Sequence, residues 1–290
     1  MFKHFFKLQW KSFFRAASFK TNLVFKILML FGALYFIAIF LALGVGSYFI
    51  IEKYGLGDPL KFVNKYIIYY LVMDIYIRYM LQKMPILNIK PLLYLPFKKS
   101  QVVSYSLGKT IFSFFNWAHA FFFVPFSIVL IIEGYNPAGV IGWHLGIMAL
   151  FYCNNFINIM MNNKDSIFYP LIAILAILGI CQYYEWFDIT VYTSPIFNLF
   201  YDIPWTSLIS WVALISLYFA AFNYFKRNMY LDAGLATKHD IAKSEDYTWL
   251  NRFGNLGTFL KNDIKLIKRN KRSKTTVIMS FIFLFYGLLF

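Results

Sequence analysis

The stretch LVFKILMLFGALYFIAIFLALGVGSYFII, residues 23–51, contains Lys26 as its only charged residue. A membrane-spanning helix needs about 20 consecutive apolar residues, so this stretch is long enough to cross a bilayer. The whole chain has the same character, because 60% of its 290 residues are hydrophobic and 14% are charged, whereas soluble domains carry about 25% charged residues. The sequence therefore predicts an all-α, polytopic membrane protein.

A basic, amphipathic segment precedes this run. It includes KLQWKSFFRAASFKTN, residues 7–22. Its basic residues recur every four positions: Lys3, Lys7, Lys11 and Arg15. Aromatic side chains such as Phe6 and Trp10 fill the opposite helical face, so residues 1–22 are predicted to form an interfacial helix in contact with anionic lipids. No small-residue cleavage site follows, which argues against a signal peptide.

Further apolar stretches predict a bundle of six transmembrane helices. The six expected spans are residues 23–51, 62–84, 102–132, 138–161, 167–187 and 205–225. A seventh apolar run, 277–290, would be about 21 Å long as a helix, which is shorter than a hydrocarbon core of about 30 Å. We expect a truncated seventh span, and a chain that is a fragment of a longer protein.

The basic residues predict the orientation. Cytoplasmic loops of membrane proteins are enriched in Lys and Arg. With the N-terminus in the cytoplasm, all but four of the 28 Lys and Arg residues lie in inside segments; the exceptions are Lys53, Lys61, Lys65 and Arg78. The net charge of +15 thus indicates topology in a bacterial cytoplasmic (inner) membrane and not nucleic-acid binding. The acidic outer loop, 185–204, is predicted to hold a short interfacial helix.

The basic pattern occurs a second time near the end of the chain. Lys7, Lys11 and Arg15 align with Lys261, Lys265 and Arg269, each set ahead of an apolar run. This predicts a repeat: an interfacial helix at 1–22, a six-span unit at 23–225, a cytoplasmic linker at 226–258, and at 259–290 the start of a second unit. The alternative is chance similarity in a chain rich in Phe, Leu and Lys.

The inside loop LYLPFKKSQVVSYSLGK, residues 93–109, has a distinctive order. Pro96 restricts Leu95 to extended conformations, so a new helix is expected to begin near Ser100. The segment resembles the loop after the second span in permeases of ABC-2-type exporters. The matching residues are Leu95, Pro96, Phe97, Lys98, Lys99, Gly108 and Lys109.

The chain also looks like a permease-like group from Bacteroidota with duplicated six-span halves. The resemblance implies that an interfacial helix precedes six spans, that this loop contacts a separate ABC ATPase, and that the protein is an exporter subunit. For Lys98 and Lys99 the alternative is a purely topological role as positive-inside anchors.

Motifs for catalysis are missing from the sequence. No G-x-x-x-x-G-K-[ST] nucleotide-binding loop, no His-Glu zinc motif and no G-x-S-x-G element occurs. Cys153 and Cys181 lie in apolar segments without metal-like spacing, and are interpreted as core thiols. We therefore expect no enzyme activity, no metal and no cofactor in this chain, and ATP hydrolysis by a separate partner.

Polar residues inside the predicted spans are candidate functional groups. Asp74 and Arg78 are four residues apart, so they share a helix face and can pair, either as a structural ion pair or as part of a substrate path or gate. Asn154 and Asn158 form a stripe, with Asn155 beside it, suited to interhelical hydrogen bonds or to a polar translocation surface.

Smaller features of the third and fourth spans are interpreted as packing. Gly142 and Gly146 form a G-x-x-x-G face suited to close helix contact. His119 and His144 are interpreted as packing residues and not as ligands or proton carriers.

Taken together, these patterns favour the membrane-spanning permease subunit of an ATP-driven exporter. Two other classes stay open. One is a channel or secondary carrier that works without an ATPase and uses Asp74, Arg78 and the asparagines. The other is a scaffold subunit that transports nothing.

Overall fold

The computed structural model describes residues 23–82, 98–161, 165–228 and 247–269, together with Lys11, Ser273, Val277 and Ser280. These residues form helices and turns and contain no strand. The chain divides into two compact units, Met1–Met229 and Tyr230–Phe290. The all-α prediction is confirmed for the described part of the chain.

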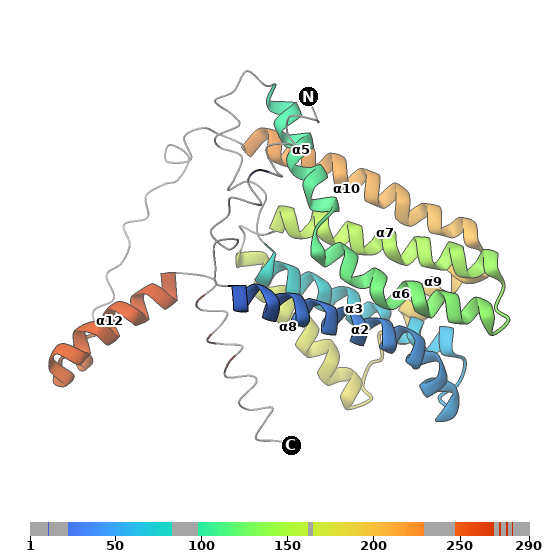
Figure 1. Cartoon of the computed structure of the whole chain (residues 1–290), viewed down its shortest axis with the longest axis horizontal. Coiled ribbons are helices and arrows are strands. Elements are labelled where there is room, and N and C mark those ends of the chain that lie inside the picture. Colours follow the sequence, from blue (N-terminus) through green and yellow to red (C-terminus); the bar gives the residue numbers. More distant parts are fainter. Residues whose placement is uncertain are drawn as a thin grey trace. The chain divides into compact units, whose positions relative to one another are not determined.

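The first unit is built from long helices, several of which run side by side (Figure 1). In chain order they are α2 (Leu23–Lys53), α3 (Pro59–Leu81), α5 (Lys99–Ile111), α6 (Phe114–Ile132), α7 (Pro137–Met161), α8 (Asp165–Tyr183), α9 (Thr190–Asp202), the 3-10 turn η3 (Pro204–Thr206) and α10 (Ser207–Asn228).

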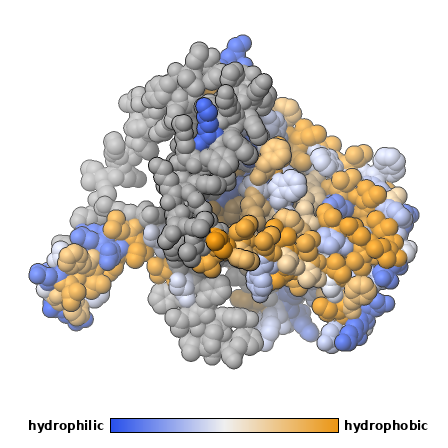
Figure 2. Space-filling view, viewed as in Figure 1, coloured by the Kyte–Doolittle hydropathy of each residue, from blue (hydrophilic) through white to orange (hydrophobic). Residues whose placement is uncertain are grey.

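Four helical segments of the described chain are long and apolar enough to cross a bilayer: Leu30–Lys53, Lys99–Ile132, Pro137–Met161 and Pro204–Arg227. Large apolar side chains are also exposed on the first unit, among them Phe31 on α2 and Val212 on α10. Figure 2 shows hydrophobic residues spread over the visible face of this unit. Water-soluble proteins rarely expose apolar patches of this extent. The chain is a membrane protein.

Helix α7 lies at the centre of the first unit and packs against α3, α6, α9 and α10. Its side chains Trp143, Ile147 and Phe151 are completely buried. Trp143 Nε1 donates to Asn64 Oδ1 of α3 at 2.7 Å, and Asn64 Nδ2 donates to Asn198 Oδ1 of α9 at 2.7 Å. Hydrogen bonds of this kind are needed because hydrocarbon offers the buried amides no other partner.

The glycine face of α7 makes a close helix contact, as predicted, but with an unexpected partner. A Cβ on Gly142 would lie 2.6 Å from Pro204 Cβ, and one on Gly146 would lie 2.9 Å from Phe200 Cδ2. Both contacts involve α9 and η3 instead of a long span. The short helix predicted within 185–204 is therefore present as α9, and it packs on the bundle with Phe197 and Phe200 buried.

The expected third span, 102–132, is not one continuous helix. It consists of α5 and α6, separated at Phe112 and Ser113. Asn116 Nδ2 donates to the carbonyl oxygens of Thr110 at 2.9 Å and of Ile111 at 3.3 Å, and so it satisfies carbonyls at the end of α5. Side-chain hydrogen bonds to the backbone compete with helix continuation. Ile111 and Phe114, the residues directly next to the break, are both apolar, so the hydropathy pattern does not show where the helix is interrupted.

Hydrogen bonds connect the α2–α3 turn to the α6–α7 turn at one end of the first unit. Asp58 Oδ1 accepts from the backbone N–H of Lys61 in the first turn of α3 at 2.8 Å, and Asp58 Oδ2 accepts from Tyr135 Oη at 2.9 Å. Gly57, with φ of 98°, and Gly134, with φ of 95°, supply left-handed backbone in these turns. Burial, followed by the hydrogen bond to Asp58, raises the pKa of Tyr135.

The second unit contains the 3-10 helix η4 (Thr248–Phe253) and α12 (Gly254–Arg269). Helix α12 is amphipathic, with exposed Leu256 and Phe259 on one face and Lys261 and Lys265 on another. Of the predicted linker, 226–258, the structure describes residues 226–228 as the end of α10 and residues 248–258 as η4 and the start of α12.

Several predictions fall on residues outside the described part. For the N-terminal interfacial helix the structure describes only Lys11, which is helical and exposed, while Lys7 and Arg15 lie outside the described residues. Arg269 is the last residue of α12. The predicted seventh span, 277–290, is described only at Val277 and Ser280.

Candidate functional site

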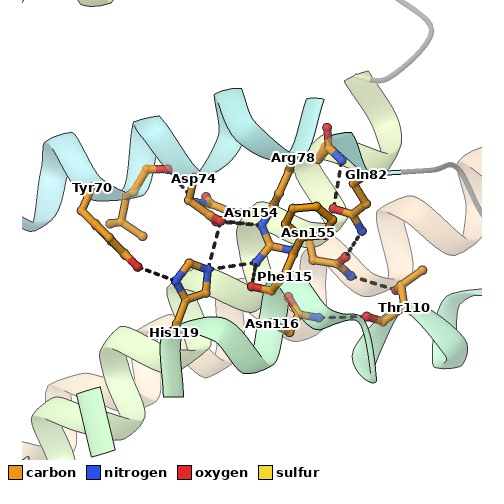
Figure 3. A network of polar contacts seen from close by, with 12 residues as sticks. Tyr70, Asp74, Arg78, Gln82, Thr110, Phe115, Asn116, His119, Asn154 and Asn155 are labelled. Atoms are coloured by element: carbon orange, nitrogen blue, oxygen red, sulfur yellow. Dashed lines mark hydrogen bonds and ion pairs between the residues drawn. The ribbon is translucent and has the colours of Figure 1, made fainter. Parts of the chain in front are cut away.

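Asp74 and Arg78 on α3 form a buried ion pair at the centre of a polar network (Figure 3). Arg78 Nε donates to both carboxylate oxygens, at 2.9 Å to Oδ1 and 2.8 Å to Oδ2. The Arg78 side chain is 0% exposed. Removing a charge from water costs on the order of several kcal/mol per ion. Only good pair geometry and further hydrogen bonds offset this cost.

Arg78 has further contacts on α6. Its Nη2 donates to the carbonyl oxygen of Phe115 at 2.9 Å and lies 3.2 Å from His119 Nε2. Its Nη1 is buried and has no hydrogen-bond partner among the described residues. The guanidinium thus keeps one donor group unused inside the bundle.

Side chains from three helices lie within hydrogen-bond distance of the Asp74 carboxylate. Besides Arg78 on its own helix, Asn154 Nδ2 of α7 donates to Oδ2 at 3.0 Å, and His119 Nε2 of α6 lies 3.0 Å from Oδ1. Asn154 also donates to the carbonyl oxygen of Leu71 at 2.8 Å. The carboxylate therefore connects α3, α6 and α7.

Both ring nitrogens of His119 lie within hydrogen-bond distance of other side chains, and one face of the ring is stacked on an aromatic ring. Its Nδ1 lies 2.9 Å from Tyr70 Oη, and its ring is stacked on Phe151 with 3.9 Å between centroids. Tyr70, His119 and Asp74 form a continuous line of hydrogen-bonding groups (Figure 3). Such a line can carry a proton between a phenol, an imidazole and a carboxylate.

A second group of amides continues the network toward the break between α5 and α6. Gln82 Nε2 donates to Asn155 Oδ1 at 2.8 Å, and Asn155 Nδ2 donates to Thr110 Oγ1 at 2.8 Å. Asn158 Nδ2 donates to Gln82 Oε1 at 3.2 Å. Together with Asn116, these residues connect α3 and α7 to the junction of α5 and α6 (Figure 3).

A family model described as a family of unknown function, DUF5687, matches residues 9–290. The chain belongs to this family. No significant match was found among the curated proteins or among the solved structures.

In this DUF5687 chain, the intramembrane residues singled out in the sequence come together. Asp74 and Arg78 pair as their spacing predicts, and Asn154, Asn155 and Asn158 all donate hydrogen bonds to residues of other helices. These asparagine contacts are interhelical bonds, the first of the two readings given above.

Sequence reasoning missed five further members of the network: Tyr70, Gln82, Thr110, Asn116 and His119. One signal was available on α3, because Tyr70, Asp74, Arg78 and Gln82 follow one another at intervals of four residues. That spacing predicts one helix face for all four; in the structure the first three lie on α3 and Gln82 is its C-cap. His119 is buried, as a packing residue would be, but it also bonds to Asp74 and Tyr70.

The residues that carry the resemblance to ABC-2 permeases lie apart from the network. Leu95 and Pro96 are outside the described residues. Lys98 is the N-cap of α5, and Lys99 is its first residue, close to the helix start predicted near Ser100. Gly108 and Lys109 lie in the last turns of α5, next to Thr110, which does belong to the network.

No metal-binding cluster of His, Cys, Asp and Glu occurs among the residues that the DUF5687 structure describes. The network itself contains one carboxylate and one imidazole, together with amides, hydroxyls and a guanidinium. This chemistry suits proton binding and hydrogen bonding between helices.

Proposed function

We propose that the chain is the membrane-spanning permease subunit of an ATP-driven, ABC-2-type exporter in a bacterial cytoplasmic membrane. Its N-terminus would lie in the cytoplasm, and a separate ABC ATPase would dock on the loop that ends at Lys98 and Lys99. One observation carries the proposal: α5 begins at Lys99, directly after this loop, and ends in a break that is bonded to the buried network.

The packing of α5 supports a mechanical role. Val102, Val103 and Leu107 are completely buried, and they form one core with Phe156 of α7 and Phe225 of α10. A tightly packed core transmits a displacement, because close-packed side chains have little room to give way. Movement of α5 would therefore be passed on to α7 and α10.

The break between α5 and α6 supports the next step. Because the two helices are separate, α5 can turn while α6 stays in place. Thr110 at the end of α5 is bonded to Asn155, and Asn155 is bonded to Gln82, the C-cap of α3. A rotation of α5 would break or remake these bonds, and so alter the contact between α3 and α7.

Anionic lipids are the second proposed partner. Helix α12 presents Lys261 and Lys265 opposite exposed Leu256 and Phe259, the arrangement of a helix that lies in a membrane interface. The N-terminal segment, with Lys7, Lys11 and Arg15, has the same pattern in sequence. Both would lie along the cytoplasmic leaflet.

A secondary carrier without an ATPase is the second candidate function. It is favoured by the buried charges, because ionisable residues inside a membrane often mark ion or proton pathways. Asp74, Arg78 and His119 would then take part directly in transport.

Affinity purification of the tagged chain from native membranes, followed by mass spectrometry, tests the proposal. Wild type is expected to bring down an ABC ATPase, whereas Lys98→Glu/Lys99→Glu loses it. Lys226→Glu/Arg227→Glu is a matched control, because it reverses two exposed charges in the last turn of α10. An ATPase-free protein that is active in liposomes would identify a carrier, and a sample without ATPase and without flux would identify a scaffold.

A further inference from the structure

His119 Nε2 faces two groups with opposite requirements. Asp74 Oδ1, at 3.0 Å, only accepts hydrogen bonds while the carboxylate is ionised, and Arg78 Nη2, at 3.2 Å, only donates them. A ring nitrogen either carries a proton and donates, or has a free lone pair and accepts. One nitrogen cannot bond to both neighbours at the same time.

Two arrangements keep a proton on Nδ1 and differ in the partner of Nε2; in a third, the only proton is on Nε2 and Tyr70 Oη donates to Nδ1, and the experiment below distinguishes it. With a lone pair on Nε2, the ring accepts from Arg78 Nη2, and its Nδ1–H donates to Tyr70 Oη. When a proton adds to Nε2, the new N–H donates to Asp74 Oδ1, while Nδ1–H still donates to Tyr70. Arg78 Nη2 then keeps only the carbonyl of Phe115 as its acceptor. The proton comes from water, and the charge of the cluster rises by one.

We propose that His119 Nε2 is a binding site for one exchangeable proton, and that this proton decides whether the imidazole bonds to Asp74 or to Arg78. The switch joins α6 to α3, because His119 belongs to α6 and both of its alternative partners to α3. Proton binding would release Arg78, which already has an unused donor at Nη1.

The surroundings of His119 restrict the switch to these groups. From α3 it faces Tyr70, Asp74 and Arg78; from α7 its ring is covered by Phe151, while Asn154 bonds to the same carboxylate. The charged groups within hydrogen-bond distance of the imidazole in the described chain are Asp74 and Arg78. The inference goes beyond the proposed transport role and holds equally for an exporter or a carrier.

Nitrogen NMR of the full chain in lipid nanodiscs, labelled with ¹⁵N at histidine, tests this site. The chain has four histidines, His4, His119, His144 and His239, so the His119 signals are those lost in His119→Asn. If that variant does not fold, single substitutions of the other three histidines assign the same signals by exclusion. Spectra are compared between about pH 8 and about pH 5, the range in which an unperturbed imidazole changes charge.

We expect His119 Nε2 to change from an unprotonated to a protonated nitrogen on acidification, while Nδ1 keeps its proton. Asp74→Asn should abolish the change in this range, and Arg78→Gln should leave Nε2 protonated throughout. His144 is the matched control: it is a half-buried imidazole of α7 bonded to Ser127 Oγ at 2.9 Å, with no charged partner among its described contacts.

Two results would overturn the proposal. The first is a neutral ring that carries its only proton on Nε2 at every pH, because Tyr70 would then donate to Nδ1 and no proton would be exchanged. The second is a wild-type change that persists unaltered in both Asp74→Asn and Arg78→Gln. Neither result depends on whether an ATPase binds the chain.

Discussion

Thr110 Oγ1 accepts a hydrogen bond from Asn155 Nδ2 at 2.8 Å and thereby joins the end of α5 to α7. The same hydroxyl donates to the carbonyl oxygen of Leu107 at 2.7 Å, so both its donor and an acceptor site are used inside the protein. Thr110 is buried, and water cannot replace either partner. This one hydroxyl therefore links the broken third span to the polar network.

Thr110→Val keeps the shape of the side chain and removes the hydroxyl. The buried side-chain amide of Asn155 then has no acceptor for the hydrogen bond that it gave to Thr110. An unsatisfied buried donor lowers the free energy of unfolding by about 1–3 kcal/mol. Thr110→Ser retains the hydroxyl and is expected to lose less. Thermal unfolding of the purified variants in detergent measures the difference, and equal losses in Val and Ser would show that the methyl group, not the hydrogen bond, is what matters.

A double-mutant cycle on Asp74 and Arg78 tests the ion pair. Asp74→Leu or Arg78→Met alone leaves the other charge buried without its partner, and each is expected to cost about 3–5 kcal/mol. The double variant removes both charges, so it should cost much less than the two single losses together. Strictly additive losses in denaturant unfolding would mean that the pair does not act as a unit.

Gly142→Ala tests the close contact between α7 and η3. The added Cβ would lie 2.6 Å from Pro204 Cβ and 2.8 Å from Pro204 Cα, so helix and turn must separate. Overpacking of this kind costs about 1–3 kcal/mol. Gly179→Ala in α8 is the control, because nothing lies within 4 Å of its added Cβ; it should leave the melting temperature unchanged or raise it, since Ala favours helix over Gly.

Low pH is expected to destabilise the first turn of α9. Asp188 Oδ1 accepts from Thr190 Oγ1 at 2.6 Å and from its backbone N–H at 2.8 Å, and these hydrogen bonds lower the pKa of Asp188. A lowered pKa in the folded state stabilises the fold above the unfolded-state pKa, about 3.9 for Asp. That stability is lost as the pH falls through the lower, folded-state value.

Thr190→Val removes one of these donors. The difference in melting temperature between wild type and Thr190→Val should be constant near neutral pH and should shrink below about pH 4. Thr206→Val serves as the comparison, because Thr206 Oγ1 bonds only to the carbonyl oxygens of Leu199 and Ile203. A difference for Thr190→Val that stays constant down to the acid range would contradict the assignment to Asp188.

Much of the fold follows from the sequence because its signals are local. Helix α5 begins at Lys99 since Pro96 disfavours helix at the residue before it, and Asp74 pairs with Arg78 since four residues make about one helical turn. Helix α9 lies within the loop where a short helix was predicted.

The missed features depend on residues that are distant in the sequence. The separation of α5 from α6 depends on Asn116 as well as on composition, and nothing in the run of apolar residues shows where its amide points. His119 has its partners on α3, more than forty positions earlier, so its own neighbours in the sequence give no sign of them. The glycine face of α7 indicates close contact but not that the partner is η3.

The two ends of the first unit are joined by hydrogen bonds in different surroundings. Where α2 meets α3, the Asp58 carboxylate holds the first turn of α3 and the α6–α7 turn at once, and Tyr201 Oη accepts from the backbone N–H of Asn136. All three of these hydrogen bonds are exposed, so water can take the place of a partner that is lost. At the end that contains α5, Thr110, Asn155 and Asn158 are buried, so no water replaces a hydrogen bond that is broken there. Opening at the α5 end is thus expected to require new partners for these side chains inside the protein, whereas the Asp58 end can exchange its partners with water.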